Sequence, residues 1–262
     1  CHHPYDCGFC AYCNRLNGVE EDPLSVLPRL HATRRESWRQ QGIQVLEDVP
    51  DNELNTTQAI VKTCTLNNEI YFDAELAKSR VADGTEPIYF LDFETINLAV
   101  PRWAGTRPYQ QVPFQYSLHL RHPNGGMEHQ EFLDISGRDP RESLAEKLIQ
   151  DCGKSGVIYA YNMSFEKRIV RELVQELPHL AVPLMELHNR IDDLLPIARD
   201  CYYNPCQKGS WSLKAVLPAL CPELDYSALE DVQHGGDAMD AFREATHPDT
   251  PPERKAHLRE RM

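Results

Sequence analysis

The sequence predicts an α/β fold in which helices flank a mixed sheet, and three observations lead to that prediction. Residues 87–96 and 156–162 are short and almost wholly apolar runs, which are typical of strands buried inside a sheet. Residues 114–122 and 128–135 suit antiparallel neighbours joined by a glycine-glycine turn. Apolar residues recur at helical spacing in the segments that separate and follow these runs. We therefore expect three strands, a helix, a strand and a helix, in that order.

The two helices have recognisable ends. In residues 139–153, Asp139 is suited to cap the N-terminus and Pro140 to occupy the first helical position. In residues 165–177, apolar side chains recur every fourth residue until a proline ends the helix. Three antiparallel strands continued by a parallel strand are the arrangement of an RNase H-like sheet. We expect such a domain over residues 86–262.

The composition favours one sizeable domain with a small appendage. The chain has 262 residues, of which 41% are hydrophobic. Its formal net charge of −13 makes the surface as a whole repel nucleic acid, so a nucleic acid must meet a local basic patch or metal ions. No run approaches the roughly 20 apolar residues of a membrane helix, and the N-terminus lacks the apolar core of a signal peptide. We expect a cytoplasmic protein.

Two segments precede the main domain. Residues 1–14 hold a cysteine cluster, and residues 15–82 are expected to form a helical connector. Within the connector, a glycine turn, an apolar pair and a helix that opens near Thr56 or Thr57 have the order of a helix-hairpin-helix, and a plain connector between domains is the alternative.

The first candidate catalytic residues are Asp92 and Glu94, the only charged residues in the strand at residues 87–96. Their spacing points both side chains to one face of the sheet. Two buried carboxylates repel each other unless a cation compensates, and Mg²⁺ or Mn²⁺ is the natural choice for oxygen ligands. The alternative is a strand end at which the carboxylates reach solvent or cap a loop.

A third carboxylate, Glu166, opens the helix after the next apolar strand, where it could face the first pair across adjacent strand ends. In the alternative interpretation, Asn162 and Ser164 are helix caps and Glu166 only satisfies the helix dipole.

These motifs, in this strand order, resemble DEDD-type 3′-5′ exonucleases. Several segments between residues 86 and 245 look more closely like an uncharacterised bacterial domain-of-unknown-function family of that superfamily. The resemblance implies a two-metal mechanism in which Asp92 bridges both ions and Glu94 holds one ion and orients a water. It places Glu166 where these enzymes carry an aspartate, with Asn162 and Phe165 as supporting residues of the same motif.

Two further features follow from the resemblance. Asp193 matches a recurrent Asp-Leu of the family and is expected to support the site rather than to bind metal. The closing Tyr-x-x-x-Asp motif of the family is not found before Met262. We therefore expect an RNase H-like domain that is incomplete at its C-terminal end and weakly active or inactive.

Two segments are candidates for contact with a nucleic-acid end. Arg102, Arg107 and Tyr109 lie in the loop after the first strand, where basic and aromatic residues alternate with glycine and proline; an ordinary surface loop is the alternative. Ser210 is expected to cap a helix that carries Lys214, and a helix N-terminus with nearby lysines binds phosphate. Trp211 beside them would either stack on a base or belong to the core.

Four cysteines close to the N-terminus form a C-x5-C-x2-C-x2-C pattern: Cys1, Cys7, Cys10 and Cys13. Four thiolates at this spacing suit a Zn²⁺ ion or a 4Fe-4S cluster, and unligated reduced thiols remain the alternative. The segment is similar to the end of an iron-sulfur nuclease module of the P-D-(D/E)-x-K type. That resemblance implies a fragment whose upstream domain is absent.

The leading hypothesis is a metal-dependent exonuclease that acts on single-stranded DNA or RNA ends. A non-catalytic module of the same fold that binds nucleic acid or serves as a scaffold is the rival. A phosphoesterase acting on small nucleotides shares the same metal site and is a third hypothesis.

Overall fold

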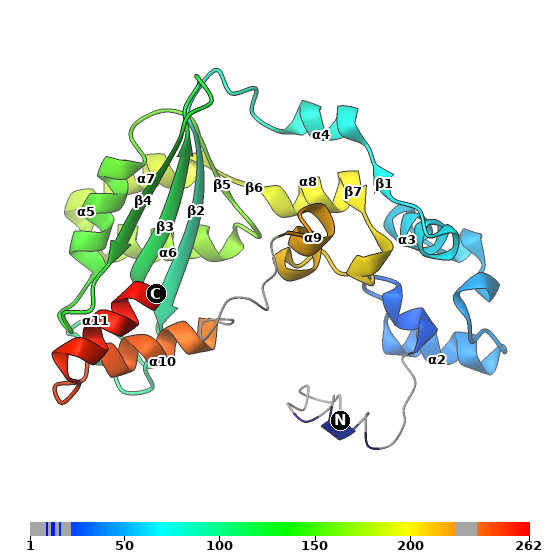
Figure 1. The fold of residues 1–262 in the computed structure, drawn as a ribbon, viewed down its shortest axis with the longest axis horizontal. Coiled ribbons are helices and arrows are strands. Elements are labelled where there is room, and N and C mark those ends of the chain that lie inside the picture. The colour runs from blue at the N-terminus through cyan, green and yellow to red at the C-terminus, as the bar shows by residue number, and fades with distance from the viewer. Residues whose placement is uncertain (1–8, 10–11, 14–15, 17–21, 224–234) are drawn as a thin grey trace. The chain divides into compact units, whose positions relative to one another are not determined.

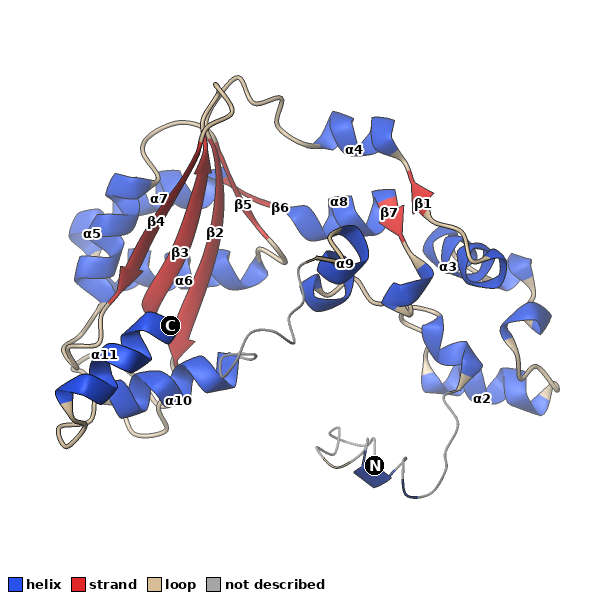
Figure 2. Ribbon diagram, in the orientation of Figure 1, coloured by secondary structure: helices blue, strands red, loops and turns tan. Residues whose placement is uncertain are grey.

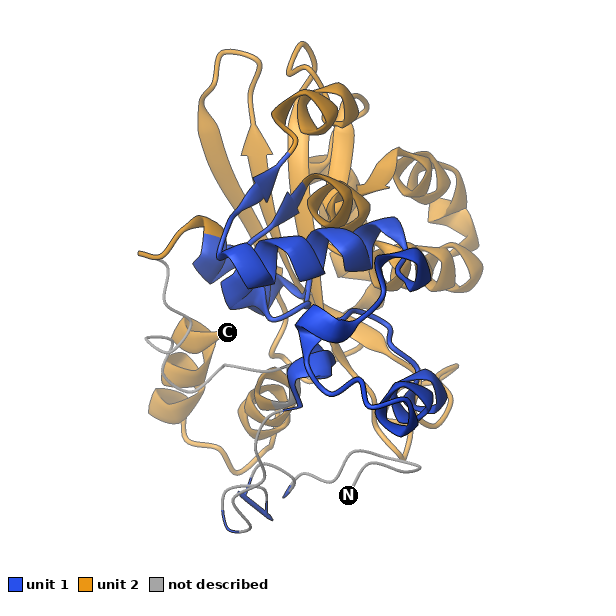
Figure 3. Cartoon of the chain, turned by 90° about the vertical axis from the view of Figure 1, so that its right-hand side faces the viewer, with its two compact units in different colours: residues 1–72, 202–219 blue, residues 73–201, 220–262 orange. Residues whose placement is uncertain are grey.

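The structure is a computed structural model that describes residues 9, 12–13, 16, 22–223 and 235–262. The chain divides into two compact units, which Figure 3 colours separately. Unit 1 comprises residues 1–72 and 202–219, and unit 2 comprises residues 73–201 and 220–262.

These units differ from the expected boundaries in two respects. Residues 73–82, which were expected in the connector, belong to unit 2. The main domain was expected to run without interruption from residue 86 to the C-terminus, whereas residues 202–219 belong to unit 1. The physical reason is strand pairing. The two-residue strand β7 (Tyr202–Tyr203) pairs antiparallel with β1 (Tyr71–Phe72), and this pairing holds the later segment in unit 1.

Unit 2 is built on a five-stranded mixed sheet of order β4-β3-β2-β5-β6 (Figure 2). Its strands are β2 (Ile88–Ile96), β3 (Val112–Arg121), β4 (Met127–Leu133), β5 (Val157–Ala160) and β6 (Ile191–Asp193). Strands β2, β3 and β4 pair antiparallel, whereas β5 and β6 continue the sheet in parallel. The expected α/β fold and RNase H-like arrangement are confirmed, and β6 is a strand that the sequence did not predict.

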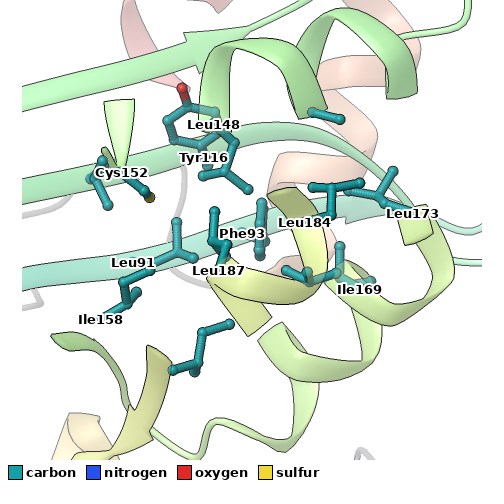
Figure 4. Close-up of a cluster of buried hydrophobic side chains, with 14 of the residues drawn as sticks. Leu91, Phe93, Tyr116, Leu148, Cys152, Ile158, Ile169, Leu173, Leu184 and Leu187 are labelled. Atoms are coloured by element: carbon teal, nitrogen blue, oxygen red, sulfur yellow. The ribbon is translucent and has the colours of Figure 1, made fainter. Parts of the chain in front are cut away.

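Three helices of unit 2 cover one face of this sheet, as Figure 1 shows. They are α5 (Arg141–Asp151), α6 (Ser164–Glu176) and α7 (Ala181–Arg190). Their apolar sides meet Leu91 and Phe93 of β2 in the main core, which Figure 4 shows in close-up. The remaining helical segments of unit 2 are α4 (Ala74–Arg80), η4 (Pro178–Leu180), α8 (Leu194–Cys201), α10 (Gly235–Ala245) and α11 (Pro252–Arg261).

A second, smaller core lies on the other face of the sheet, where α10 packs on the end of β2. A β-bulge explains why Phe114 belongs to this smaller core. The register between β2 and β3 shifts after Glu94, so that Phe114 of β3 has no partner on β2. Phe114 consequently joins Ile96 and Phe242 beneath α10 instead of joining Tyr116 in the main core.

The predicted start of α5 is wrong by one residue. The N-cap is Pro140, which has no side-chain cap bond, and the helix begins at Arg141. Asp139 instead accepts a hydrogen bond from the backbone NH of Arg141 and pairs with its guanidinium at 2.6 Å. The end of α6 is as predicted, since the helix stops at Glu176 before Pro178.

Unit 1 is mainly helical, as expected for the connector. Its elements are η1 (Pro23–Val26), α2 (Ala32–Gln40), η2 (Leu46–Asp48), η3 (Asp51–Glu53), α3 (Thr56–Asn67), η5 (Pro205–Gln207) and α9 (Leu213–Leu220), in addition to β1 and β7. The predicted helix start near Thr56 or Thr57 is confirmed, since α3 begins at Thr56, and a capping box between Asn55 and Gln58 explains it. Within the described residues, no helix is long and apolar enough to cross a membrane.

Candidate active site

Asp92 and Glu94 point away from the main core. The burial of β2 alternates, so Leu91 and Phe93 face the helices while the two carboxylates share the opposite face. Asp92 is exposed and Glu94 is half-buried. The prediction that both carboxylates are buried is therefore wrong, because α10 covers this face only near the end of β2.

The neighbouring strands add polar side chains to the same face. Gln115 lies opposite Glu94 and Ser117 lies opposite Asp92, while Glu131 of β4 lies opposite Ser117. The amide nitrogen of Gln115 donates to the backbone carbonyl of Met262, whereas its buried Oε1 has no partner among the described residues. Oxygen-bearing side chains therefore surround the two carboxylates on the sheet.

Glu166 is buried at the start of α6, with 4% of its surface exposed. It lies on the same side of the helix as Ile169 and Leu173, which pack in the main core. Its Oε2 atom has no hydrogen-bond partner among the described residues. A buried carboxylate oxygen without a partner is costly, so this position calls for a proton or a cation.

Electrostatic repulsion links the three carboxyl groups. Burial and, to a smaller extent, repulsion by the nearby Asp92 together raise the pKa of Glu94 to about 7. Burial likewise raises the pKa of Glu166 to about 7, with Asp92 and Asp193 as repelling neighbours. Desolvation also raises the pKa of Asp92, although the residue is partly open to solvent. Asp92 therefore lies within electrostatic reach of both glutamates.

Asp193 fixes the chain next to this group. It ends β6, and its Oδ1 accepts hydrogen bonds from the backbone NH groups of Asn162 and Leu195, both at 2.9 Å. Asn162 has a left-handed backbone with φ of 68°, which asparagine tolerates better than most residues. Asp193 thus ties the end of β5 to β6, a geometry that agrees with the supporting role expected for it.

The alternative in which Asn162 and Ser164 cap the helix does not match the structure. The N-cap of α6 is Met163, which has no side-chain cap bond. The Oδ1 of Asn162 accepts from the hydroxyl of Ser164 at 3.2 Å instead of from a backbone NH. Phe165 is half-buried against the main core, with the guanidinium of Arg168 at 5.4 Å from its ring.

The chemistry of this group suits a hard divalent cation. All donors are oxygen atoms, and no cationic side chain of the described residues contributes to the pKa of Asp92, Glu94 or Glu166. Within the same residues, no three His, Cys, Asp or Glu side chains lie close enough together to enclose a metal ion. Mg²⁺ is commonly held by one or two carboxylates, waters and a substrate phosphate, and this arrangement needs no such enclosure.

The loop after β2 lies in the same unit as the carboxylates and is held in place. Arg102 donates from Nη1 to the hydroxyl of Thr246 at 2.8 Å. Arg107 pairs with Glu172 at 3.5 Å. Tyr109, the third candidate for substrate contact, is 70% exposed.

Ser210 and Lys214 belong to unit 1, not to the unit that holds the carboxylates. The expectation that Ser210 caps the helix is wrong: α9 begins at Leu213, and the Oγ of Ser210 accepts from the backbone NH of Ser212 at 3.2 Å. Trp211 is buried and donates its indole NH to the carbonyl of Tyr202 at 2.8 Å. The core interpretation of this tryptophan is confirmed, and base stacking is excluded by its burial.

The proposed cysteine site falls largely outside the described residues. Cys1, Cys7 and Cys10 are among the residues that the structure does not describe, while Cys13 is a half-buried free thiol. The Zn²⁺ or iron-sulfur site stays a prediction.

Sequence reasoning missed Gln115 and the residues that anchor the loop after β2. Arg141 is one of these residues, because its guanidinium bonds to the carbonyl of Ala104 at 3.1 Å and to Glu176 at 2.7 Å. The register between β2 and β3 would have been needed to find Gln115. No local pattern marks this role of Arg141, because Ala104 and Glu176 are distant from it in the sequence.

The segment that carries the carboxylates can be compared with known families. Residues 89–212 match a family model described as a domain of unknown function (DUF2779). The DUF2779 match contains Asp92, Glu94, Glu166 and Asp193, and ends before Lys214. Searches of the curated proteins and of the solved structures each gave no match. The resemblance to a domain-of-unknown-function family is confirmed, while the DUF2779 description assigns no activity, and the exonuclease and iron-sulfur resemblances stay predictions.

Proposed function

We propose that unit 2 is a metal-dependent 3′-5′ exonuclease-like domain that hydrolyses phosphodiester bonds at nucleic-acid ends. One observation supports this proposal above the others: Asp92 lies within electrostatic reach of both Glu94 and Glu166, and no cation of the described residues compensates them. Such a cluster persists in a folded protein when it serves a ligand, since repulsion and desolvation otherwise oppose it.

In the proposed mechanism Asp92 and Glu94 would hold Mg²⁺ or Mn²⁺ on their shared face of β2. Glu166 would act on the ion from α6 through a bound water, because no three such side chains of the described residues could enclose an ion directly. A bound ion lowers the pKa of a water and stabilises the charge that develops on phosphate. Glu94 and Glu166 have a pKa of about 7 without the ion, so they give up protons as it binds. Glu94 would also orient the attacking water, and Asp193 ties the chain after β5 to the end of β6 through the backbone NH of Asn162.

The test measures metal binding and cleavage separately. Manganese is titrated into the chain by calorimetry, and trimming of an end-labelled single strand is followed under the same conditions. We expect binding that strengthens from pH 6 to pH 8, because the two glutamates must lose protons. Asp92→Asn should abolish both the heat of binding and any trimming, and the stoichiometry distinguishes one ion from two.

Glu146→Gln provides a matched control, since Glu146 is exposed on α5 of the same unit. This variant should bind manganese as the wild type does. If the folded chain shows no heat with Mn²⁺ or Mg²⁺ at any pH in this range, the carboxylates are structural and the exonuclease proposal fails.

The absence of three enclosing ligands among the described residues favours a second candidate. In this alternative, unit 2 is a non-catalytic module of the same fold that binds nucleic acid or serves as a scaffold. It predicts oligonucleotide binding that is indifferent to divalent ions and to Asp92→Asn, with no cleavage. Hydrolysis of mononucleotide esters without trimming would instead indicate a phosphoesterase.

A further inference from the structure

A groove in unit 2 begins where β2 ends and runs between the following loop and α10. It consists of two neighbouring hollows of about 430 Å³ and about 750 Å³, which share Leu98, Val100, Asp240 and Arg243 as lining residues. Ile96 lines the first hollow and follows Glu94 by two residues on the same strand, about 7 Å along β2. The groove therefore opens beside the candidate active site.

The wall of the groove carries large side chains that the fold leaves uncovered. Val100 is 80% exposed and Tyr109 is 70% exposed, and Leu98 and Met239 line the hollow between them. Apolar and aromatic side chains gathered around a hollow are typical of a binding site, whereas scattered exposed residues need no explanation.

Tyr109 adopts a backbone conformation that bulky residues avoid. Its φ is 59°, in the left-handed region, and its backbone NH donates to the carbonyl of Leu98 at 2.8 Å. Because the ring is mostly exposed, packing of the side chain does not compensate for this conformation. Strained residues of this kind cluster at functional sites.

Anchors on both sides hold the loop in this shape. Arg141 binds the carbonyl of Ala104 at 3.1 Å, and Gln110 donates to Glu176, which also accepts from Arg141. The indole NH of Trp103 donates to the carbonyl of Gly137 at 3.2 Å. The groove is therefore preformed, which reduces the entropy lost when a ligand binds.

Two arginines make the groove suitable for an anion, although the chain carries a net charge of −13. Arg102 bonds to the hydroxyl of Thr246 and has no acidic partner within the described part of the chain. Within the residues that the structure describes, Arg243 forms an ion pair with Asp240 alone, at 3.7 Å, and both side chains are exposed, so the pair is weak. Glu244, the other acidic residue of the lining, is already neutralised by Arg254 at 2.7 Å.

We propose that this groove holds the terminal unpaired nucleotides of a single-stranded nucleic acid. A base lies against Val100 and Tyr109, and the phosphates lie beside Arg102 and Arg243. This assignment rests on the proposed function, since it delivers the strand end to Asp92. Aromatic rings accept any base by stacking, and arginine binds phosphate oxygens through paired NH groups. The strand is single because a base inside a duplex is stacked on both faces and has no free face to offer Tyr109.

The test is fluorescence anisotropy of a short, end-labelled oligothymidylate added to the full chain in EDTA, so that no cleavage intervenes. Tyr109→Ala should weaken binding about tenfold, as expected for the loss of one stacking partner. Tyr109→Phe should bind as the wild type does. Arg243→Gln should weaken binding and reduce its dependence on salt. A blunt duplex should compete poorly, and DNA and RNA strands of one sequence are compared directly.

Two exposed positions away from the groove serve as controls. Val182→Ala on α7 and Arg259→Gln on α11 should leave the affinity unchanged. The assignment is overturned if Tyr109→Ala and Arg243→Gln bind like the wild type, or if the wild type does not bind the single strand. A concentration-dependent dimer that Val100→Asp dissociates, without oligonucleotide binding, would also overturn it and identify a second copy as the occupant.

The outcomes for the groove and for the exonuclease remain distinguishable. Asp92→Asn should keep its affinity for the oligonucleotide in EDTA, because this residue acts through the metal ion. If the groove variants bind the oligonucleotide more weakly but the wild type binds no manganese, only the exonuclease proposal is refuted. If the wild type trims the strand in a metal-dependent way but Tyr109→Ala binds the oligonucleotide as the wild type does, only the groove proposal is refuted.

Discussion

Glu166 combines helix formation, burial and the proposed chemistry in one residue. Only a few residues separate β5 from α6, so the first turn of the helix follows directly on the C-terminal end of β5. The apolar side of α6 faces the main core, and Glu166 shares that side with Ile169 and Leu173. Its carboxyl group is therefore buried without a partner for Oε2 in the described chain, which raises its pKa to about 7.

Replacement of Glu166 by glutamine is expected to change how stability depends on pH. The pKa of this carboxyl is about 7 in the folded chain and 4.5 ordinarily, so the folded state keeps a proton that the unfolded chain has lost. The unfolding free energy of the wild type should therefore fall between about pH 4.5 and pH 7 and stay lower above that range. In EDTA at pH 8, Glu166→Gln should exceed the wild type in stability by on the order of 1–3 kcal/mol.

Urea unfolding at pH 5 and pH 8 measures this difference. The pKa of Glu94 is also raised. The pH dependence of the unfolding free energy should therefore become smaller in Glu166→Gln without disappearing. Glu146→Gln, on the surface of α5, should follow the wild type at both values. Equal effects of Glu166→Gln at pH 5 and pH 8 would contradict the assignment of a raised pKa.

At the scale of elements, the pairing of β2 with β5 begins where two backbones lie in close contact. Gly156 precedes β5 with φ of 86°, and a Cβ atom at this position would overlap the carbonyl oxygen of Pro87, which precedes β2. The parallel pairing of Ile88 with Val157 begins next to this contact. The strand that carries Asp92 and the strand that leads to Glu166 therefore start from a position that only glycine fits.

Two alanine substitutions distinguish the cost of overlap with Pro87 from the cost of a left-handed backbone. Gly156→Ala should destabilise the chain by about 3 kcal/mol or more, because strain and the overlap with Pro87 add together. Gly125→Ala, in the turn between β3 and β4, has φ of 85° and open space around its Cβ. It should lose only about 1–2 kcal/mol, the cost of the left-handed conformation. Thermal and urea unfolding measure the stability of both variants. Equal losses in Gly156→Ala and Gly125→Ala would show that the contact with Pro87 does not limit the size of residue 156.

At the scale of the whole molecule, the tryptophans report on the two units separately. The sequence has three of them: Trp38 and Trp211 are buried in unit 1, and Trp103 packs beside Phe242 in unit 2. Unit 2 contains the carboxylates, so a bound ion stabilises it by mass action and leaves the intrinsic stability of unit 1 unchanged.

Manganese should therefore shift one unfolding transition. With the ion at about 100 times its dissociation constant, unit 2 gains about 2.7 kcal/mol, and its midpoint rises by several degrees. Trp103→Phe leaves only probes of unit 1, and the double variant Trp38→Phe with Trp211→Phe leaves only the probe of unit 2. Thermal fluorescence scans should show the shift in the double variant alone. An equal shift for both probes would mean that the units unfold together.

Local patterns in the sequence were sufficient for the order of the elements. The apolar run of β2, the glycine pair between β3 and β4 and the helical periodicity of α6 depend on neighbouring residues, so they are visible without the fold. The shared face of Asp92 and Glu94 follows for the same reason, because side chains of a strand alternate with a period of two. The expected strand order and α/β class agree with the structure.

The sequence by itself determined the strands, the main helices and the pairing of Asp92 with Glu94 on one face. Tertiary structure decided that this face lies open near Asp92, that Glu166 is buried, and that residues 202–219 join unit 1. It also placed α10 beside the loop after β2 and so created the groove. These features depend on contacts between residues far apart in the chain, where packing and strand register, rather than local periodicity, determine which side chains meet.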